Sequence, residues 1–142
     1  MITRGSLGIG DEHSVVDDIV MRIIELLPGD WVEARFRFDA LWGYAEGVGK
    51  VTKEGNVEEV FTGNIPLIAR LHDLRNGMYE DGTGTWYGMM IDIKNDGSYS
   101  TKYNYTFKPK FDHEPVVLTY IEDLQQYPRN VDLIPGWLQE LL

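Results

Sequence analysis

The stretch TWYGMMIDIKNDGSYSTKYNY, Thr85 to Tyr105, decides the fold predicted for this chain. On both sides of Asn95-Asp96-Gly97, apolar or β-forming residues alternate with smaller or polar ones, which is the two-residue period of half-buried strands. A three-residue loop with Gly97 in the left-handed conformation suits this turn, because glycine has no Cβ to oppose it. The stretch therefore predicts a β-hairpin.

The length of the loop sets the register of this hairpin. A two-residue turn at Asp96-Gly97 would set Ile91 against Lys102, and we reject it for that reason. The other side of the hairpin, with Trp86 and Met90, is expected to be covered by another layer or exposed. The predicted pairs, whose eight side chains would share one buried face, are Ile93 with Tyr99, Ile91 with Thr101, Met89 with Tyr103 and Tyr87 with Tyr105.

The rest of the chain shows helical and strand patterns without a βαβ repeat. Apolar residues at helical spacing predict helices over 14–27 and, after Asn64 as N-cap, over 65–79. Clean alternation predicts a strand over 31–39, and two looser, glycine-containing strands are expected within 41–61. Residues 1–11 are expected to form a flexible arm and 80–84 a mobile loop.

Two short helices are predicted after the hairpin, over 116–127 and from Asp132 or Pro135 onward. The complete order is helix, three strands, helix, two strands and two short helices. It indicates an α+β fold, in which an antiparallel sheet of about five strands has helices packed on one face.

The charge of the chain narrows the possible partners. Its 142 residues include 13 Lys and Arg against 23 Asp and Glu, a formal net charge of -10. Such a charge repels nucleic acids and acidic membranes, so neither is expected as a partner, and it favours a basic protein. The sequence contains no cysteine, which excludes thiol chemistry, and its first ten residues lack the features of a signal peptide. A cytoplasmic protein is expected.

The familiar catalytic signatures are absent from the sequence. It contains no GxSxG, HExxH, SxxK or Walker pattern, and Tyr103 stands where a calcium loop beginning at Asp92 would need a glutamate. We therefore predict no catalytic, cofactor-binding or metal-binding residues. The alternative that stays open is a small metal-dependent enzyme or ligand-binding domain that uses Asp112, His113 and Glu114, since imidazole and carboxylate groups are common metal ligands.

Acidic loops and aromatic residues are the candidates for a partner-binding surface. Trp42 and Tyr44 lie in a glycine-rich stretch with an irregular apolar pattern, which favours exposure, and aromatic residues are common at binding hot spots. Acidic residues on either side of the hairpin would attract a basic partner. The candidates are Trp42, Tyr44, Glu80, Asp81, Asp112, Glu114, Glu122 and Asp123.

Three stretches resemble the YezG-type immunity proteins of bacterial polymorphic-toxin systems. They are LLPGDW (Leu26 to Trp31), VEARFRFD (Val32 to Asp39) and W-Y-G-x-x-I-D-I-x-x-D-G-x-Y-x-x-x-Y-N-Y (Trp86 to Tyr105). The resemblance covers most of residues 14–105, and its motifs are structural rather than catalytic. The tail YIEDLQQYPRNVDLIPGWL (Tyr120 to Leu138) is similar instead to immunity proteins of toxins of the tuberculosis-necrotizing-toxin type, which hydrolyse NAD.

This resemblance implies a small cytoplasmic immunity protein, or antitoxin, that binds a cognate toxin domain and blocks its active-site cleft or substrate path. It implies no chemistry of the protein's own, and residues 1–142 would form a single immunity-type domain. The tail favours a NAD(P) glycohydrolase as the toxin, whereas the acidic charge favours a nuclease, because nucleic-acid-binding proteins are usually basic. The choice between these toxins stays open.

Overall fold

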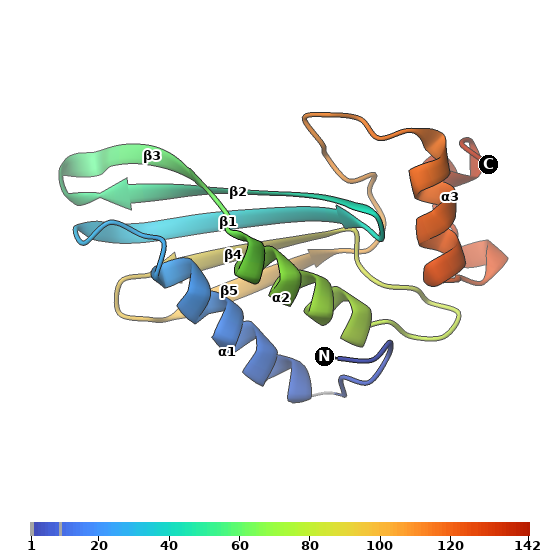
Figure 1. Ribbon diagram of the computed structural model, residues 1–142, viewed down its shortest axis with the longest axis horizontal. Helices are drawn as coiled ribbons and strands as arrows, with labels where there is room; N and C mark the ends of the chain where they lie inside the picture. Colours follow the sequence, from blue (N-terminus) through green and yellow to red (C-terminus); the bar gives the residue numbers. More distant parts are fainter. Residues whose placement is uncertain (1, 9) are drawn as a thin grey trace.

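The alternating segments of the sequence form one five-stranded antiparallel sheet in the computed structural model, which describes residues 2–8 and 10–142 (Figure 1). The strand order is β3-β2-β1-β4-β5, and all four pairings are antiparallel. The predicted α+β class and antiparallel sheet are confirmed. The strands are β1 (Trp31–Leu41), β2 (Tyr44–Lys53), β3 (Val57–Thr62), β4 (Gly88–Lys94) and β5 (Tyr99–Asn104), and the helices are α1 (Asp11–Ile24), α2 (Ile65–Gly77), α3 (Val117–Gln126) and α4 (Gly136–Gln139), with 3-10 turns η1 (Glu54–Asn56) and η2 (Val131–Leu133).

The β4–β5 hairpin has the predicted three-residue loop. The Lys94 N–H donates to the carbonyl of Ser98 at 2.9 Å, and Gly97 has a φ of 89°. Three predicted pairs are confirmed, namely Ile93 with Tyr99, Ile91 with Thr101 and Met89 with Tyr103.

The prediction is wrong at the open end of this hairpin. The chain leaves the regular ladder before Gly88, where the N–H of Ala40 donates to the carbonyl of Tyr87 at 2.9 Å. Trp86 is therefore fully buried in the same core as Met89, and Tyr87 packs into a second cluster instead of pairing with Tyr105. Strict alternation would place Tyr87, and not Trp86, on the same face as Met89, and the structure has the reverse.

Helices α1 and α2 lie side by side on one face of the sheet and close the main core (Figure 1). Asn64 caps α2 as predicted, because its side-chain oxygen accepts a hydrogen bond from the Leu67 N–H at 3.0 Å. Helix α1 begins at Asp11 rather than Ser14, and acidic residues in its first turn suit the positive end of the helix dipole. The core residues are Val15, Val16, Ile19, Val20, Ile23, Phe36, Phe38, Ala40, Leu67, Leu71, Leu74, Trp86, Met89, Ile91 and Ile93.

The expectation of a flexible arm over residues 1–11 is wrong for the residues of this segment that the structure describes. Ile2 and Leu7 pack against the main core, and the Gly5 N–H donates to the carbonyl of Asn76 at 2.9 Å. Residues 1 and 9 lie outside the described residues. The two apolar side chains and backbone hydrogen bonds to the end of α2 dock the segment despite its glycines.

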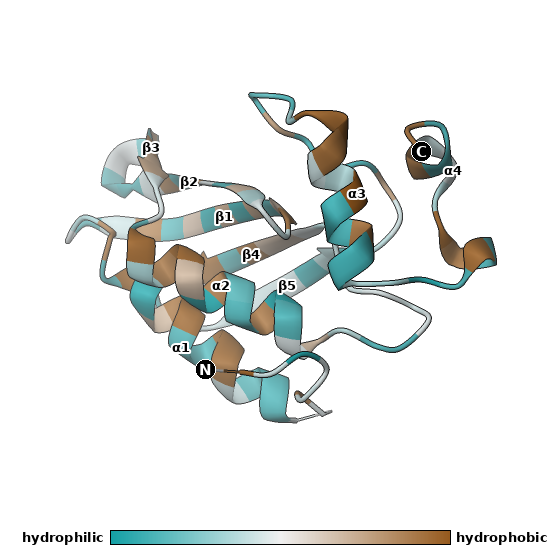
Figure 2. Ribbon diagram, turned by 45° about the vertical axis from the view of Figure 1, so that its right-hand side comes forward, coloured by the Kyte–Doolittle hydropathy of each residue, from teal (hydrophilic) through white to brown (hydrophobic). Residues whose placement is uncertain are grey.

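Helices α3 and α4 lie beyond the end of the sheet rather than on its helix-covered face (Figures 1 and 2). They form a smaller cluster of buried residues with the end of β1, and we call residues 117–142 the C-terminal unit. The cluster consists of Leu41, Tyr87, Tyr120 and Leu138. The face of the sheet opposite α1 and α2 therefore stays largely open.

Candidate protein-binding surface

The segment between β5 and α3, residues 105–116, crosses one end of the open face, and we call it the strap (Figure 1, orange). Glu46 of β2 accepts backbone N–H groups of Asp112 and His113 at 2.7 and 3.2 Å. The Arg37 guanidinium donates to the Lys110 carbonyl at 3.0 Å. The strap has no regular secondary structure, so these bonds from strand side chains are what fix its path across the sheet.

Aromatic packing adds a second attachment for the strap. The rings of Tyr44 and Phe111 meet edge to face, with centroids 5.1 Å apart. The Tyr44 hydroxyl donates to Glu46 at 2.5 Å, and this bond to a carboxylate raises the pKa of Tyr44 to about 12. Burial tends to raise the pKa of Glu46, but the hydrogen bonds from Tyr44, Asp112 and His113 outweigh it and lower that pKa below its ordinary value. Glu46 is therefore an ionised anchor at neutral pH.

Trp42 lies at the β1–β2 turn, next to α3. Its backbone N–H donates to Asp123 at 2.6 Å, while its side chain leaves the residue 50% exposed. Glu122 comes from the same turn of α3 and its carboxylate lies close to Gly43. The turn of the sheet and the first turns of α3 thus form one surface with the strap.

The structure brings five of the eight predicted residues onto this surface, which we call the strap surface. Glu114 is tied down there, since it accepts a hydrogen bond from the Tyr120 hydroxyl and pairs with Lys108 at 3.4 Å. Asp112 is exposed and Glu122 half-buried. The five residues are Trp42, Tyr44, Asp112, Glu114 and Glu122.

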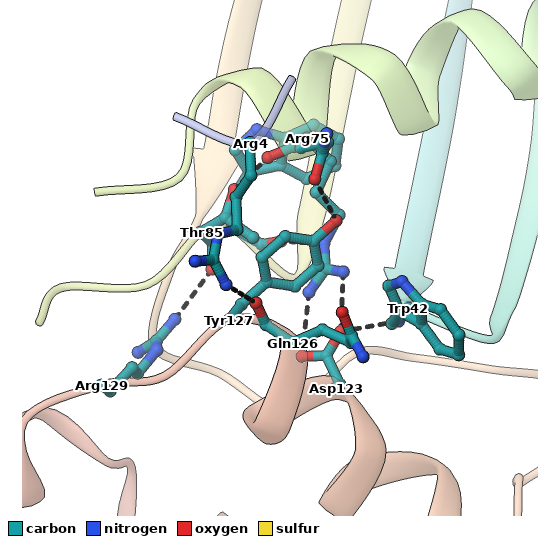
Figure 3. A network of polar contacts seen from close by, with 10 residues as sticks. Arg4, Trp42, Arg75, Thr85, Asp123, Gln126, Tyr127 and Arg129 are labelled. Atoms are coloured by element: carbon teal, nitrogen blue, oxygen red, sulfur yellow. Dashed lines mark hydrogen bonds and ion pairs between the residues drawn. The ribbon is translucent and has the colours of Figure 1, made fainter. Parts of the chain in front are cut away.

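Asp123 does not belong to this surface, and the prediction that it is accessible is wrong. It is 4% exposed and binds both terminal guanidinium nitrogens of Arg75, at 2.7 and 3.1 Å (Figure 3). The third guanidinium nitrogen of Arg75 donates to the carbonyl of Trp86 at 2.6 Å. A buried carboxylate whose oxygens bind the Arg75 guanidinium and the Trp42 N–H is not accessible to a partner protein, so Asp123 has a structural role.

Glu80 and Asp81 lie apart from the strap surface, in the loop between α2 and β4. Both are exposed, as predicted. The loop itself is held in place, because Glu80 and Gly84 exchange backbone hydrogen bonds and the Asn130 N–H donates to the carbonyl of Gly82 at 2.7 Å. The expectation of a mobile loop over 80–84 is corrected by these backbone hydrogen bonds.

Exposed apolar residues of the strap surface escaped the sequence prediction. Phe107 is 76% exposed, Val116 72% and Leu118 58%. Figure 2 shows the first turn of α3 in the brown of hydrophobic residues. Val116 and Leu118 would fit a buried helix face equally well, and Phe107 lies in a stretch without a regular pattern, so the sequence carried no signal that these side chains point outward. Nothing in the sequence indicated that Glu46 anchors the strap.

The remaining open face of the sheet is a shallow depression of about 710 Å³ between β3 and β5. Its charges largely neutralise one another. Arg35 pairs with Asp92 at 2.6 Å, and Lys50 pairs with Glu58 at 3.4 Å. This mutual pairing makes the depression a weaker candidate than the strap surface for a charged partner.

The geometry gives no support to a metal centre at Asp112, His113 and Glu114. Glu114 is directed to Tyr120 and Lys108, and the Asp112 and His113 backbone groups point to Glu46. Across residues 2–8 and 10–142, no three or more His, Asp or Glu side chains are grouped so that they could hold a metal ion. Among the same residues, no buried side-chain nitrogen or oxygen lacks a hydrogen-bond partner.

Comparisons of the sequence with known proteins found no relative. No protein-family model matches the chain, and neither does any curated protein. None of the described helices combines the length and the apolar character of a membrane span.

Proposed function

We propose that this protein is an immunity protein that binds and neutralises a cognate secreted bacterial toxin in the cytoplasm by covering the toxin's active site. The toxin would be a basic NAD(P) glycohydrolase or nuclease. The observation that carries the proposal is the strap surface, where exposed apolar and aromatic side chains stand beside acidic ones on a strap that is already anchored. The sequence resemblance to immunity proteins supports the same function.

The strap surface has the properties expected of an inhibitor that acts by binding alone. Its backbone is fixed by Glu46 and Arg37, so little conformational entropy is lost when a partner binds. Trp42 and Phe107 provide large exposed anchors of the kind that dominate binding energy. Asp112 adds a negative charge at the rim, which speeds the approach of a basic protein.

The test uses the product of the gene immediately upstream of this protein's own gene as the candidate toxin. Association rates with the purified product are measured at low salt for the wild-type protein and for Asp112→Lys/Glu122→Lys. We expect the variant to associate at least about tenfold more slowly, because rim charges act mainly on the association rate.

The matched control is Glu25→Lys/Glu54→Lys, which makes the same change in net charge with exposed residues outside the strap surface. It should slow association much less. Equal effects of the two variants would contradict the assignment of the strap surface. The absence of any complex or protection with the wild-type protein would overturn the proposed function itself.

A further inference from the structure

Strand β5 is an edge strand whose outward backbone groups can be assigned. Among the strands of the described residues, it pairs only with β4. The bond from the Lys94 N–H to the Ser98 carbonyl makes these two residues a hydrogen-bonded pair. In an antiparallel ladder such pairs alternate, so Ser100 and Lys102 direct their N–H and C=O groups to β4. The groups of the residues between them face away from the sheet. These residues are Tyr99, Thr101 and Tyr103.

The surroundings of this edge combine tyrosines with acidic residues. Tyr99 donates a hydrogen bond to Asp17 of α1. Burial, and next the negative charge of Glu12, raise the pKa of Tyr103 to about 12, and the same two causes raise the pKa of Tyr105. Glu80 adds to the shift of Tyr105, so α1 and the α2–β4 loop both bring carboxylates close to the aromatic side of β5.

The opposite edge of the sheet has a different balance of charge. The acidic residues of β3, Glu58 and Glu59, are paired with Lys50 and Lys53 of β2 at 3.4 and 2.7 Å. Glu12 and Glu80 form no ion pair among the described residues. The unpaired carboxylates therefore lie on the tyrosine side of the β5 edge, whereas Lys102 of β5, which also forms no ion pair among the described residues, has its side chain on the opposite, open face.

We propose that β5 accepts an extended, Lys- or Arg-rich segment of the toxin as a sixth strand of the sheet. This inference rests on the proposed function and specifies how the partner is held. The outward N–H and C=O groups of Tyr99, Thr101 and Tyr103 provide the backbone hydrogen bonds. Basic side chains of the added strand lie against the tyrosine rings and near Glu12 and Glu80, where cations are attracted both to ring faces and to carboxylates.

Two observations favour this occupant over a second copy of the chain. Each copy carries a net charge of -10, and pairing two β5 edges would bring two sets of uncompensated carboxylates together. The edge is also continuous with the strap surface, because Asn104 at the end of β5 leads directly into Tyr105 and Phe107. A toxin segment along β5 and a toxin body on the strap surface therefore form one interface.

The first measurement is hydrogen exchange of the wild-type protein with and without the upstream gene product. The outward amides of Tyr99, Thr101 and Tyr103 should exchange at least about tenfold more slowly in the complex, because they become hydrogen-bonded. Residues 57–62 of β3 serve as the internal control and should change much less. A complex in which 99–103 gain no protection would overturn the strand-addition inference while leaving the proposed function intact.

The second measurement compares Thr101→Pro with Thr101→Val. Proline removes an N–H that faces away from β4, so the internal ladder stays complete, and such positions on edge strands tolerate proline. Valine keeps the N–H and the branched shape. We expect Thr101→Pro to weaken the complex about tenfold, as for the loss of one hydrogen bond, and Thr101→Val to bind like the wild-type protein.

Thermal unfolding of both variants shows whether they are folded. Binding of folded Thr101→Pro at wild-type strength would overturn the inference, and if this variant does not fold, the exchange measurement on the wild-type protein decides. No complex with the wild-type protein would overturn the proposed function, and this inference with it.

Discussion

The main core and the C-terminal unit are attached to the same sheet by different interactions. Helices α1 and α2 pack through a continuous set of buried apolar side chains. The C-terminal unit has only a small apolar cluster around Leu41, and polar contacts join it to the rest of the protein. They include the buried pair between Asp123 and Arg75 and the bond from the Arg129 guanidinium to the Thr85 carbonyl at 2.9 Å. The guanidinium of Arg75 also lies over the ring of Tyr127, 4.9 Å from its centroid (Figure 3).

This difference has a physical consequence for each region. Apolar packing depends on buried area and volume, so many combinations of residues can satisfy it. A buried ion pair depends on two particular groups, and the loss of either leaves a charge without a partner in a medium of low dielectric constant. The C-terminal unit, which provides part of the strap surface, is therefore held by a smaller apolar cluster than the main core and depends more on specific polar contacts.

The largest expected effect comes from breaking the buried pair. Asp123→Ala leaves the guanidinium of Arg75 without its carboxylate and should lower the free energy of unfolding by about 3–5 kcal/mol, measured by urea denaturation. Asp92→Ala removes the partner of Arg35 in an exposed pair and should lower it by less than about 1 kcal/mol. The double variant Arg75→Met/Asp123→Leu removes the unpaired charge but should recover only part of the loss, because the Trp86 carbonyl and the Trp42 N–H lose their partners. Equal losses of stability in Asp123→Ala and Asp92→Ala would show that the buried pair contributes no more to stability than the exposed one.

A smaller and more local effect is expected from the small cluster. Leu138→Ala should destabilise the C-terminal unit by about 2–3 kcal/mol, at the lower end of the range for buried leucines, because several neighbours in this cluster are only partly buried and can move into the space. Hydrogen exchange should quicken in residues 117–142 while α1 and α2 keep their protection. Leu71→Ala is the matched change in the main core and should quicken exchange throughout the sheet. A uniform loss of protection in Leu138→Ala would mean that the two regions unfold as one.

The smallest effect is expected at Glu46, which ties the strap to the sheet. Glu46→Gln should lower the free energy of unfolding at pH 7 by about 1 kcal/mol, because three hydrogen bonds to a charged acceptor are weakened. The folded state lowers the pKa of Glu46 from its ordinary 4.5. Its stabilisation is therefore complete above that ordinary value and is lost as the pH falls through the lower folded-state pKa.

The difference between wild-type protein and Glu46→Gln, measured from pH 7 down to pH 3, isolates this contribution. Asp39 acts in the opposite direction, since burial raises its pKa, but it is present in both proteins and cancels. The difference should shrink as the pH falls below 4.5. A difference that stays constant over this range would contradict the role of ionised Glu46.

The main core was largely predictable, because local patterns are enough to specify it. The period of two in Ile91 and Ile93, the helical spacing of Ile19 and Ile23, and the turn at Gly97 are all expressed within a few neighbouring residues. The predictions failed where the packing of a residue depends on a segment that is distant in the sequence. Trp86 and Tyr87 are adjacent residues that pack into different clusters, and one of these clusters is built from residues near the end of the chain.

The candidate surface was predictable only in its composition. The sequence indicated that Asp112, Glu122 and Asp123 are acidic residues in the C-terminal third, but nothing in it distinguished exposed Asp112 from buried Asp123. The partner of Asp123 is Arg75, which lies 48 positions earlier. Pairing over such a separation leaves no periodic trace in a single sequence.

The sequence by itself determined the antiparallel sheet, its hairpin register and the acidic character of the protein, because these follow from alternation, turn residues and charge counts. The tertiary structure alone decided which acidic residues face solvent, where the strap crosses the sheet and which groups of β5 point outward. Those properties depend on contacts between distant segments, such as Glu46 with Asp112 and Trp42 with Asp123, and on the position of β5 at the edge of the sheet. Local sequence determines whether each segment forms a helix, a strand or a turn, and long-range packing determines which other segments it contacts.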